Sequence, residues 1–170
     1  MLGQRLRQVS SSTEEQFIEA ARIGDLVTLR ALLAEVDPKA QHSKALAVAA
    51  MNARLQAALA LYPSSDPEAI EHWCHLRQGT DPELILRMVE WARTGSVGLG
   101  SPSEYSKAMA IAAEEEHEGL MGLLYLHCCP DQAVSYCRER AWFAASRRLE
   151  ADFLHRATPI AKARAVVCRL

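Results

Sequence analysis

The chain repeats itself at a distance of 63 residues. Residues 43–50, Ser-Lys-Ala-Leu-Ala-Val-Ala-Ala, align with residues 106–113, Ser-Lys-Ala-Met-Ala-Ile-Ala-Ala. The alignment continues without a gap to Arg77 and Arg140, and eleven of its thirty-five positions are identical. Chance is a poor explanation for this agreement. We therefore predict a tandem duplication, and repeats of this kind form stacked supersecondary units.

Length and composition are those of a folded globular domain. The chain has 170 residues, of which 49% are apolar and 24% are charged. A chain of this length buries enough surface to be stable without disulfides or metals, and its composition lies far from the disordered class. We expect one domain over residues 13–170, preceded by a flexible leader over residues 1–12.

Helical spacing of apolar residues dominates, and β-type alternation of useful length is missing. The duplicated modules cover residues 42–104 and 105–170, and each begins with a pair of helices. Pro67 and Pro130 then occupy the first turn of a third helix, where a missing N–H costs little. A further helix begins at Asp81-Pro82 and ends before Gly95, and the glycine-rich segment Thr94–Pro102 separates the modules. The protein is predicted to be all-α.

The two ends of the domain differ from the modules. Residues 13–41 form an N-terminal cap pair, in which Thr13 begins the first helix with Gln16 in a capping box, and the helices meet at Gly24-Asp25. Towards the C-terminus, the helix that begins at Pro130 is expected to continue through residues 141–145 toward Leu154. A last helix is expected to begin at Thr158-Pro159.

The turn of the cap pair carries a family resemblance. Ala20-Ala21-Arg22-Ile23-Gly24-Asp25-Leu26, followed by spaced leucines, resembles the helix-turn-helix of an ankyrin repeat, and residues 112–117 with the aliphatics that follow are a second match. The Thr-Pro-Leu-His opening of the family is missing. Ala53 and Glu116 stand where later copies should have the turn glycine, and the link from Leu33 to Leu46 is too short for a β-finger.

This resemblance implies a divergent α-solenoid of about five stacked helix-turn-helix pairs, without the binding fingers of the family. Proteins of this type present a groove to a partner protein or peptide. The resemblance points to bacterial ankyrin-like proteins, so we expect a non-enzymatic adaptor or interaction module. The leader contains Ser10, Ser11 and Ser12, and a Ser-rich, weakly structured leader is what some bacterial secretion machines recognise. An association with secretion is therefore part of this expectation.

Charge argues against nucleic acid or membrane as partners, because the formal net charge is only −2 and supplies no attractive field. From Arg138 onward, however, eight cations outnumber three anions. Lys44 and Lys107 occupy equivalent positions in the two modules. Lysine is rarely buried, so both should be exposed. The candidate partner-binding residues are therefore Lys44, Lys107, Arg138, Arg147 and Arg148.

The sequence carries no catalytic signature, and we predict no cofactor, metal or catalytic residue. The alternative is a metal- or small-molecule-binding protein centred on His72, Cys74 and His75, since two histidines three positions apart share a helix face. The second module has Ser135 and Arg138 at the histidine positions and so lacks this pair. Five cysteines without zinc-ribbon spacing, and no apolar leader, predict reduced thiols in the cytoplasm.

Overall fold

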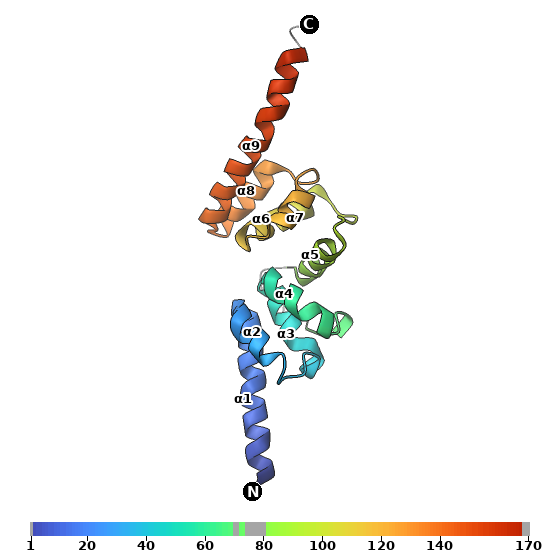
Figure 1. The fold of residues 1–170 in the computed structure, drawn as a ribbon, viewed down its shortest axis with the longest axis vertical. Coiled ribbons are helices and arrows are strands. Elements are labelled where there is room, and N and C mark those ends of the chain that lie inside the picture. Colours follow the sequence, from blue (N-terminus) through green and yellow to red (C-terminus); the bar gives the residue numbers. More distant parts are fainter. Residues whose placement is uncertain (1, 70–71, 74–80, 168–170) are drawn as a thin grey trace. The chain divides into compact units, whose positions relative to one another are not determined.

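The chain divides into two compact units, Met1–Thr94 and Gly95–Leu170 (Figure 1). The computed structural model describes residues 2–69, 72–73 and 81–167, and within these ranges the regular elements are helices, with no strand. The all-α prediction is confirmed for these residues. The boundary between the units falls in the glycine-rich segment that was expected to separate two modules of one domain.

Within its described residues, the N-terminal unit contains two stacked helix pairs. The first pair is α1 (Leu2–Ile23) and α2 (Leu26–Leu32), and the second is α3 (Ala40–Met51) and α4 (Leu55–Leu61). Helix α1 packs on α3, and α2 packs on α4. The short 3-10 helix η1 (Tyr62–Ser64) follows, and α5 (Pro82–Thr94) packs against the second pair. Helix α5 confirms the start predicted at Asp81-Pro82.

The first helix begins at Leu2, not at Thr13 as predicted. Thr13 has the signature of a cap, but the residues before it include good helix formers and no proline, so the helix extends through it.

Up to Val167, where its described residues end, the C-terminal unit also contains two helix pairs. They are α6 (Pro102–Glu114) with α7 (Glu118–Leu124), and α8 (Pro130–Glu139) with α9 (Phe143–Val167). Helix α6 contacts the other three, and α8 and α9 pack along each other. Ser101 begins α6 with a capping box, in which its hydroxyl accepts from the Glu104 N–H and the Glu104 carboxylate accepts from the Ser101 N–H.

The same turn joins the helices of all four pairs. One residue takes a left-handed conformation, at φ 84° for Gly24, 56° for Ala53, 55° for Glu116 and 59° for Ala141. The next amide bonds back to a carbonyl five residues earlier, over 2.8–2.9 Å in each turn, which is the Schellman closure of a helix C-terminus. At Gly24 a side chain would also meet the Arg54 side chain, since a Cβ would lie 3.1 Å from Cδ.

The duplicated segments share local structure. Helices α4 and α7 have the same bounds after an offset of 63 residues, and α3 and α6 end at equivalent residues. The Ser43 hydroxyl accepts the Asp66 N–H over 2.9 Å, and its counterpart Ser106 accepts the Cys129 N–H over the same distance. Both serines are buried. Each hydroxyl therefore fixes the start of the segment that follows its helix pair.

The likeness extends beyond the aligned residues. The Arg93 guanidinium lies over the Tyr62 ring, 5.1 Å from its centre, and the Arg156 guanidinium lies 4.7 Å from the centre of the Tyr125 ring. Both the tyrosines and the arginines are 63 residues apart. The first half of α9 thus corresponds to α5, which the sequence alignment alone did not indicate.

Small residues form the centre of both units. Five alanines of α3 and α4, Ala47, Ala49, Ala50, Ala57 and Ala58, are fully buried, as are Ala108, Ala110, Ala112 and Ala113 of α6. Small side chains let neighbouring helices approach closely. Cys137 is buried as predicted, whereas its expected counterpart Cys74 lies outside the described residues.

Three local predictions need correction or remain partly outside the described residues. The helix from Pro130 does not continue through residues 141–145, because Ala141 takes the left-handed conformation and α9 begins at Phe143. Helix α9 then runs through Thr158-Pro159 without a break. A third helix was expected to begin at Pro67. Of its described residues, 68–69 and 72–73 have 3-10 geometry, whereas α8 at the equivalent place in the second module is an α-helix.

Candidate functional site

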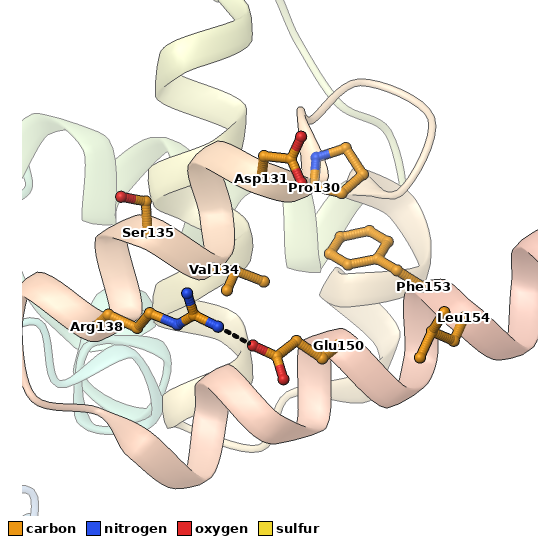
Figure 2. Close-up of a pocket in the computed structure, with 8 residues that line it drawn as sticks. All are labelled: Pro130, Asp131, Val134, Ser135, Arg138, Glu150, Phe153 and Leu154. Atoms are coloured by element: carbon orange, nitrogen blue, oxygen red, sulfur yellow. Dashed lines mark hydrogen bonds and ion pairs between the residues drawn. The ribbon is translucent and has the colours of Figure 1, made fainter.

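A groove of about 500 Å³ lies between α8 and α9 of the C-terminal unit (Figure 2). Helix α8 contributes one wall and α9 the other. The lining residues are Pro130, Asp131, Val134, Ser135 and Arg138 from α8, and Glu150, Phe153 and Leu154 from α9. The groove therefore has apolar walls with charged side chains among them.

Helical spacing explains why these residues share the groove. On α8, Asp131, Val134, Ser135 and Arg138 recur at three- and four-residue intervals, which places them on one face. The opposite face carries Ala133 and Cys137, and both are fully buried. Glu150, Phe153 and Leu154 follow the same spacing on α9. Burial of one face of α8 in the core thus leaves its other face to line the groove.

An ion pair crosses the groove from one helix to the other. Arg138 Nη2 lies 2.6 Å from Glu150 Oε1, and the two side chains are 63% and 41% exposed (Figure 2). The Ser146 hydroxyl also donates to Glu150 Oε1 over 3.4 Å. An exposed pair of this kind contributes at most about 1 kcal/mol to stability. Either partner can therefore turn to an external charged group at small cost.

Phe153 and Leu154 supply the apolar part of the groove. Phe153 is only 9% exposed, whereas Leu154 is 71% exposed. The Phe153 ring stacks on Tyr125 with centres 5.5 Å apart and planes at 30°, and Tyr125 in turn lies beneath Arg156. In Figure 2 the Phe153 ring is directed toward Pro130. The wall is therefore rigid at Phe153, and Leu154 offers an uncovered aliphatic side chain beside it.

The basic residues predicted near the C-terminus have different surroundings. Arg138 lies in the groove, and Arg147 is exposed on α9 outside its lining. Arg148 instead reaches the turn between α6 and α7, where Nη2 lies 2.5 Å from Glu116 Oε1 and Nη1 donates to the Ala113 carbonyl. These contacts give Arg148 a role in holding α9 against that turn.

The two equivalent lysines lie in different units and have different environments. Lys44 is half-buried, donates to Gln41 Oε1 over 3.2 Å and lies 5.2 Å from the centre of the Trp73 ring. Lys107 is exposed. Equivalent positions therefore do not give these two cations equivalent contacts, and their role in partner binding stays a prediction.

The predicted histidine and cysteine cluster is only partly described. Cys74 and His75 lie outside the described residues. The ring of His72 faces the ring of His42, with centres 4.6 Å apart and planes at 31°, a contact that sequence spacing did not reveal. Within the part of the chain that the structure describes, no group of three or more His, Cys, Asp or Glu side chains could hold a metal ion.

The thiols of Cys128 and Cys137 are poor nucleophiles. Burial raises the pKa of each thiol to about 11. The Glu114 carboxylate adds to the shift in the pKa of Cys137, and Cys129 adds to that of Cys128. A reactive cysteine needs a lowered pKa that gives a thiolate near neutral pH, so both environments are those of structural thiols.

A second hollow, of about 420 Å³, lies at α1 and α2 in the N-terminal unit. Two of its acidic side chains, Glu19 and Asp25, already have intramolecular partners, and Glu15 is the third acidic residue of the lining. Glu19 binds Arg22 over 2.5–2.7 Å, and Asp25 accepts from the Thr28 hydroxyl over 2.6 Å. The Asp25 carboxylate also accepts the Val27 and Thr28 amides as the cap of α2. Because Asp25 caps α2 and Glu19 is paired with Arg22, this hollow is the weaker candidate.

Comparison with known proteins gave no match to a protein-family model, a curated protein or a solved structure. Among the helices within the described ranges, none has the length and apolar character needed to cross a membrane. Functional inference therefore depends on the geometry of the chain itself.

Proposed function

We propose that this protein is a non-enzymatic interaction module of the adaptor type, and that the α8–α9 groove binds a helix or peptide of a partner protein. The observation that carries the proposal is the groove itself. It combines the exposed Leu154, the fixed ring of Phe153 and the exposed Arg138–Glu150 pair. Apolar contact supplies affinity in such a site, and the charged pair supplies orientation.

The fold part of this proposal is an α-solenoid made of ankyrin-like helix pairs. Four helix pairs close with the same left-handed turn, and α1–α2 stacks on α3–α4. The matching serine bonds and tyrosine–arginine contacts support descent of the two modules from one duplicated unit. Stacked helical repeats use their exposed surfaces for protein binding.

The cellular part of the proposal is a bacterial cytoplasmic adaptor associated with secretion. It rests on the ankyrin-like turn and on the cysteines. Cys128, Cys129 and Cys137 are free thiols, which suits a reducing compartment. The partner is another protein or peptide, in preference to nucleic acid or membrane.

A peptide library displayed on phage, selected on the full chain, tests the site. We expect selected peptides to carry apolar residues at helical spacing. Contact with Leu154 should bury most of its exposed surface, so Leu154→Asp should weaken their binding by about tenfold or more. Leu126 is 86% exposed and does not line the groove, so Leu126→Asp is the matched control.

The charged pair gives an independent readout in the same experiment. Arg138→Glu should remove the orienting charge of the groove and should also change the sequences that the selection enriches. Peptides that bind Leu154→Asp, Arg138→Glu and the wild type with equal affinity would show that the α8–α9 groove is not the binding site.

A further inference from the structure

Two histidines that are distant in sequence face each other in the N-terminal unit. The imidazole rings of His42 and His72 have centres 4.6 Å apart, and both side chains are exposed. Imidazole nitrogens bind zinc at about 2.1 Å, so tetrahedral coordination places the centres of two rings on one ion roughly 5 Å apart. The observed separation is slightly shorter than this, so the two exposed rings lie close enough to share one cation after a small rotation.

The backbone at His42 is strained. Gln41, His42 and Ser43 have φ values of 50°, 56° and 54°, a left-handed conformation that residues with a Cβ adopt at a cost and seldom in succession. Such strain persists only where the surroundings impose it, and it concentrates at functional sites. The left-handed conformation of these three residues therefore indicates a constraint imposed by their surroundings.

Two hydrogen bonds tie this strained segment to the one that carries His72. The Ser43 hydroxyl accepts the Asp66 N–H over 2.9 Å, and Trp73 Nε1 donates to the His42 carbonyl over 3.2 Å. The Trp73 and His72 rings also pack nearly perpendicular to each other, with centres 5.1 Å apart. Trp73 thus contacts both the backbone of His42 and the ring of His72.

The second module shows that the serine bond does not require the strain. Ser106 makes the equivalent bond to Cys129, yet neither Ser106 nor the preceding Tyr105 has a positive φ. The counterparts of His42 and His72 are Tyr105 and Ser135. The left-handed segment is therefore found in the module that has the two histidines and not in the one that lacks them.

We propose that His42 and His72 form a two-histidine site for a divalent transition-metal cation of the kind that favours imidazole, such as Zn²⁺. Water or a group from a partner would complete the coordination, so the affinity should be modest. The site differs from the His72, Cys74 and His75 cluster that the sequence suggested, because His42 supplies the second ligand. It is independent of the groove in the C-terminal unit.

Calorimetric titration of the full chain with ZnCl₂ tests the proposal, with a phosphine reductant keeping the thiols reduced. We expect one ion per chain. Removing a hydrogen-bond partner of a metal ligand costs about 10–100-fold in metal affinity. Removing the ligand itself should cost no less, so His42→Ala and His72→Ala should each weaken binding by at least about tenfold. His155 is an exposed histidine of α9, and His155→Ala should bind as the wild type does.

Zinc binding that survives His42→Ala would overturn the proposal, and so would the lack of binding by the wild type. A second measurement avoids the effect of substitution on folding. In the wild type, NMR of ¹⁵N-labelled imidazoles should show the signals of His42 and His72 shifting together up to one equivalent of Zn²⁺. A shift of the His72 signals that leaves the His42 signals unchanged would also overturn the two-histidine site.

Discussion

Ser106→Ala should destabilise the C-terminal unit although it removes a single oxygen atom. Ser106 is 2% exposed, and its hydroxyl accepts the Cys129 N–H over 2.9 Å while donating to the Pro102 carbonyl over 2.7 Å. Cys129 is the N-cap residue of α8 and its own side chain makes no capping bond. The Ser106 hydroxyl therefore takes the place of a cap for α8.

The expected magnitude follows from two opposing effects. Leaving a partly buried amide without a partner costs about 1–3 kcal/mol. Alanine is the better helix former inside α6 and returns about 0.5 kcal/mol. The free energy of unfolding should therefore fall by about 0.5–2.5 kcal/mol. Ser43→Ala should act similarly on the N-terminal unit, because its bond to the Asp66 amide has the same length.

Native-state hydrogen exchange is the suitable assay, because it resolves stability amide by amide in a chain whose two units need not unfold together. Ser135→Ala is the control, since Ser135 is an exposed serine of α8 that bonds Glu139 over 3.3 Å, and surface changes stay within about 0.5 kcal/mol. If α6 and α8 exchange equally fast in Ser106→Ala and Ser135→Ala, the hydroxyl does not hold the start of α8.

Two further predictions concern the same unit. Ala141 is exposed with φ 59°, so Ala141→Gly should relieve left-handed strain and stabilise the unit by about 0.5–1 kcal/mol. The control Ala151→Gly, on the exposed face of α9, should destabilise the unit by about 1 kcal/mol. Denaturation experiments in which both substitutions change the free energy of unfolding in the same direction would contradict this explanation of the turn. Burial holds the pKa of Cys137 at about 11, above its ordinary value of 9.0, so the unfolded chain loses this proton first and stability falls as pH rises through that interval. Between pH 8 and pH 10 the wild type should lose about 1 kcal/mol more than Cys137→Ala, and parallel pH profiles of the two proteins would refute the buried-thiol explanation.

Much of the secondary structure follows from local sequence. The turn at Gly24-Asp25 was predicted because glycine adopts a positive φ freely and aspartate caps the next helix. The start of α5 at Asp81-Pro82 and of α8 at Pro130 followed from proline at the first helical turn. The duplication also predicted correctly that α4 and α7 would be the partners of α3 and α6.

Local signals failed where tertiary contacts determine the conformation. No glycine or proline marks the turn at Ala141, and the sequence there predicted a continuous helix. Packing of α8 along α9, together with the bond from the Trp142 amide to the Cys137 carbonyl, compensates the left-handed strain. At Thr158-Pro159 the error was of the opposite kind. The sequence there predicted the start of a new helix, but both residues lie inside α9.

The candidate sites divide in the same way. Arg138 was recognised as a candidate because it begins a cation-rich region, but its groove exists only because Glu150, Phe153 and Leu154 of α9 lie opposite α8. The sequence likewise indicated His72 and not its neighbour His42. Helical periodicity and proline or glycine act within a few residues, so sequence alone determined the all-α class, the repeat and several of the helix boundaries. Contacts between residues twelve or more positions apart depend on how helices pack, so only the tertiary structure decided the groove and the histidine pair.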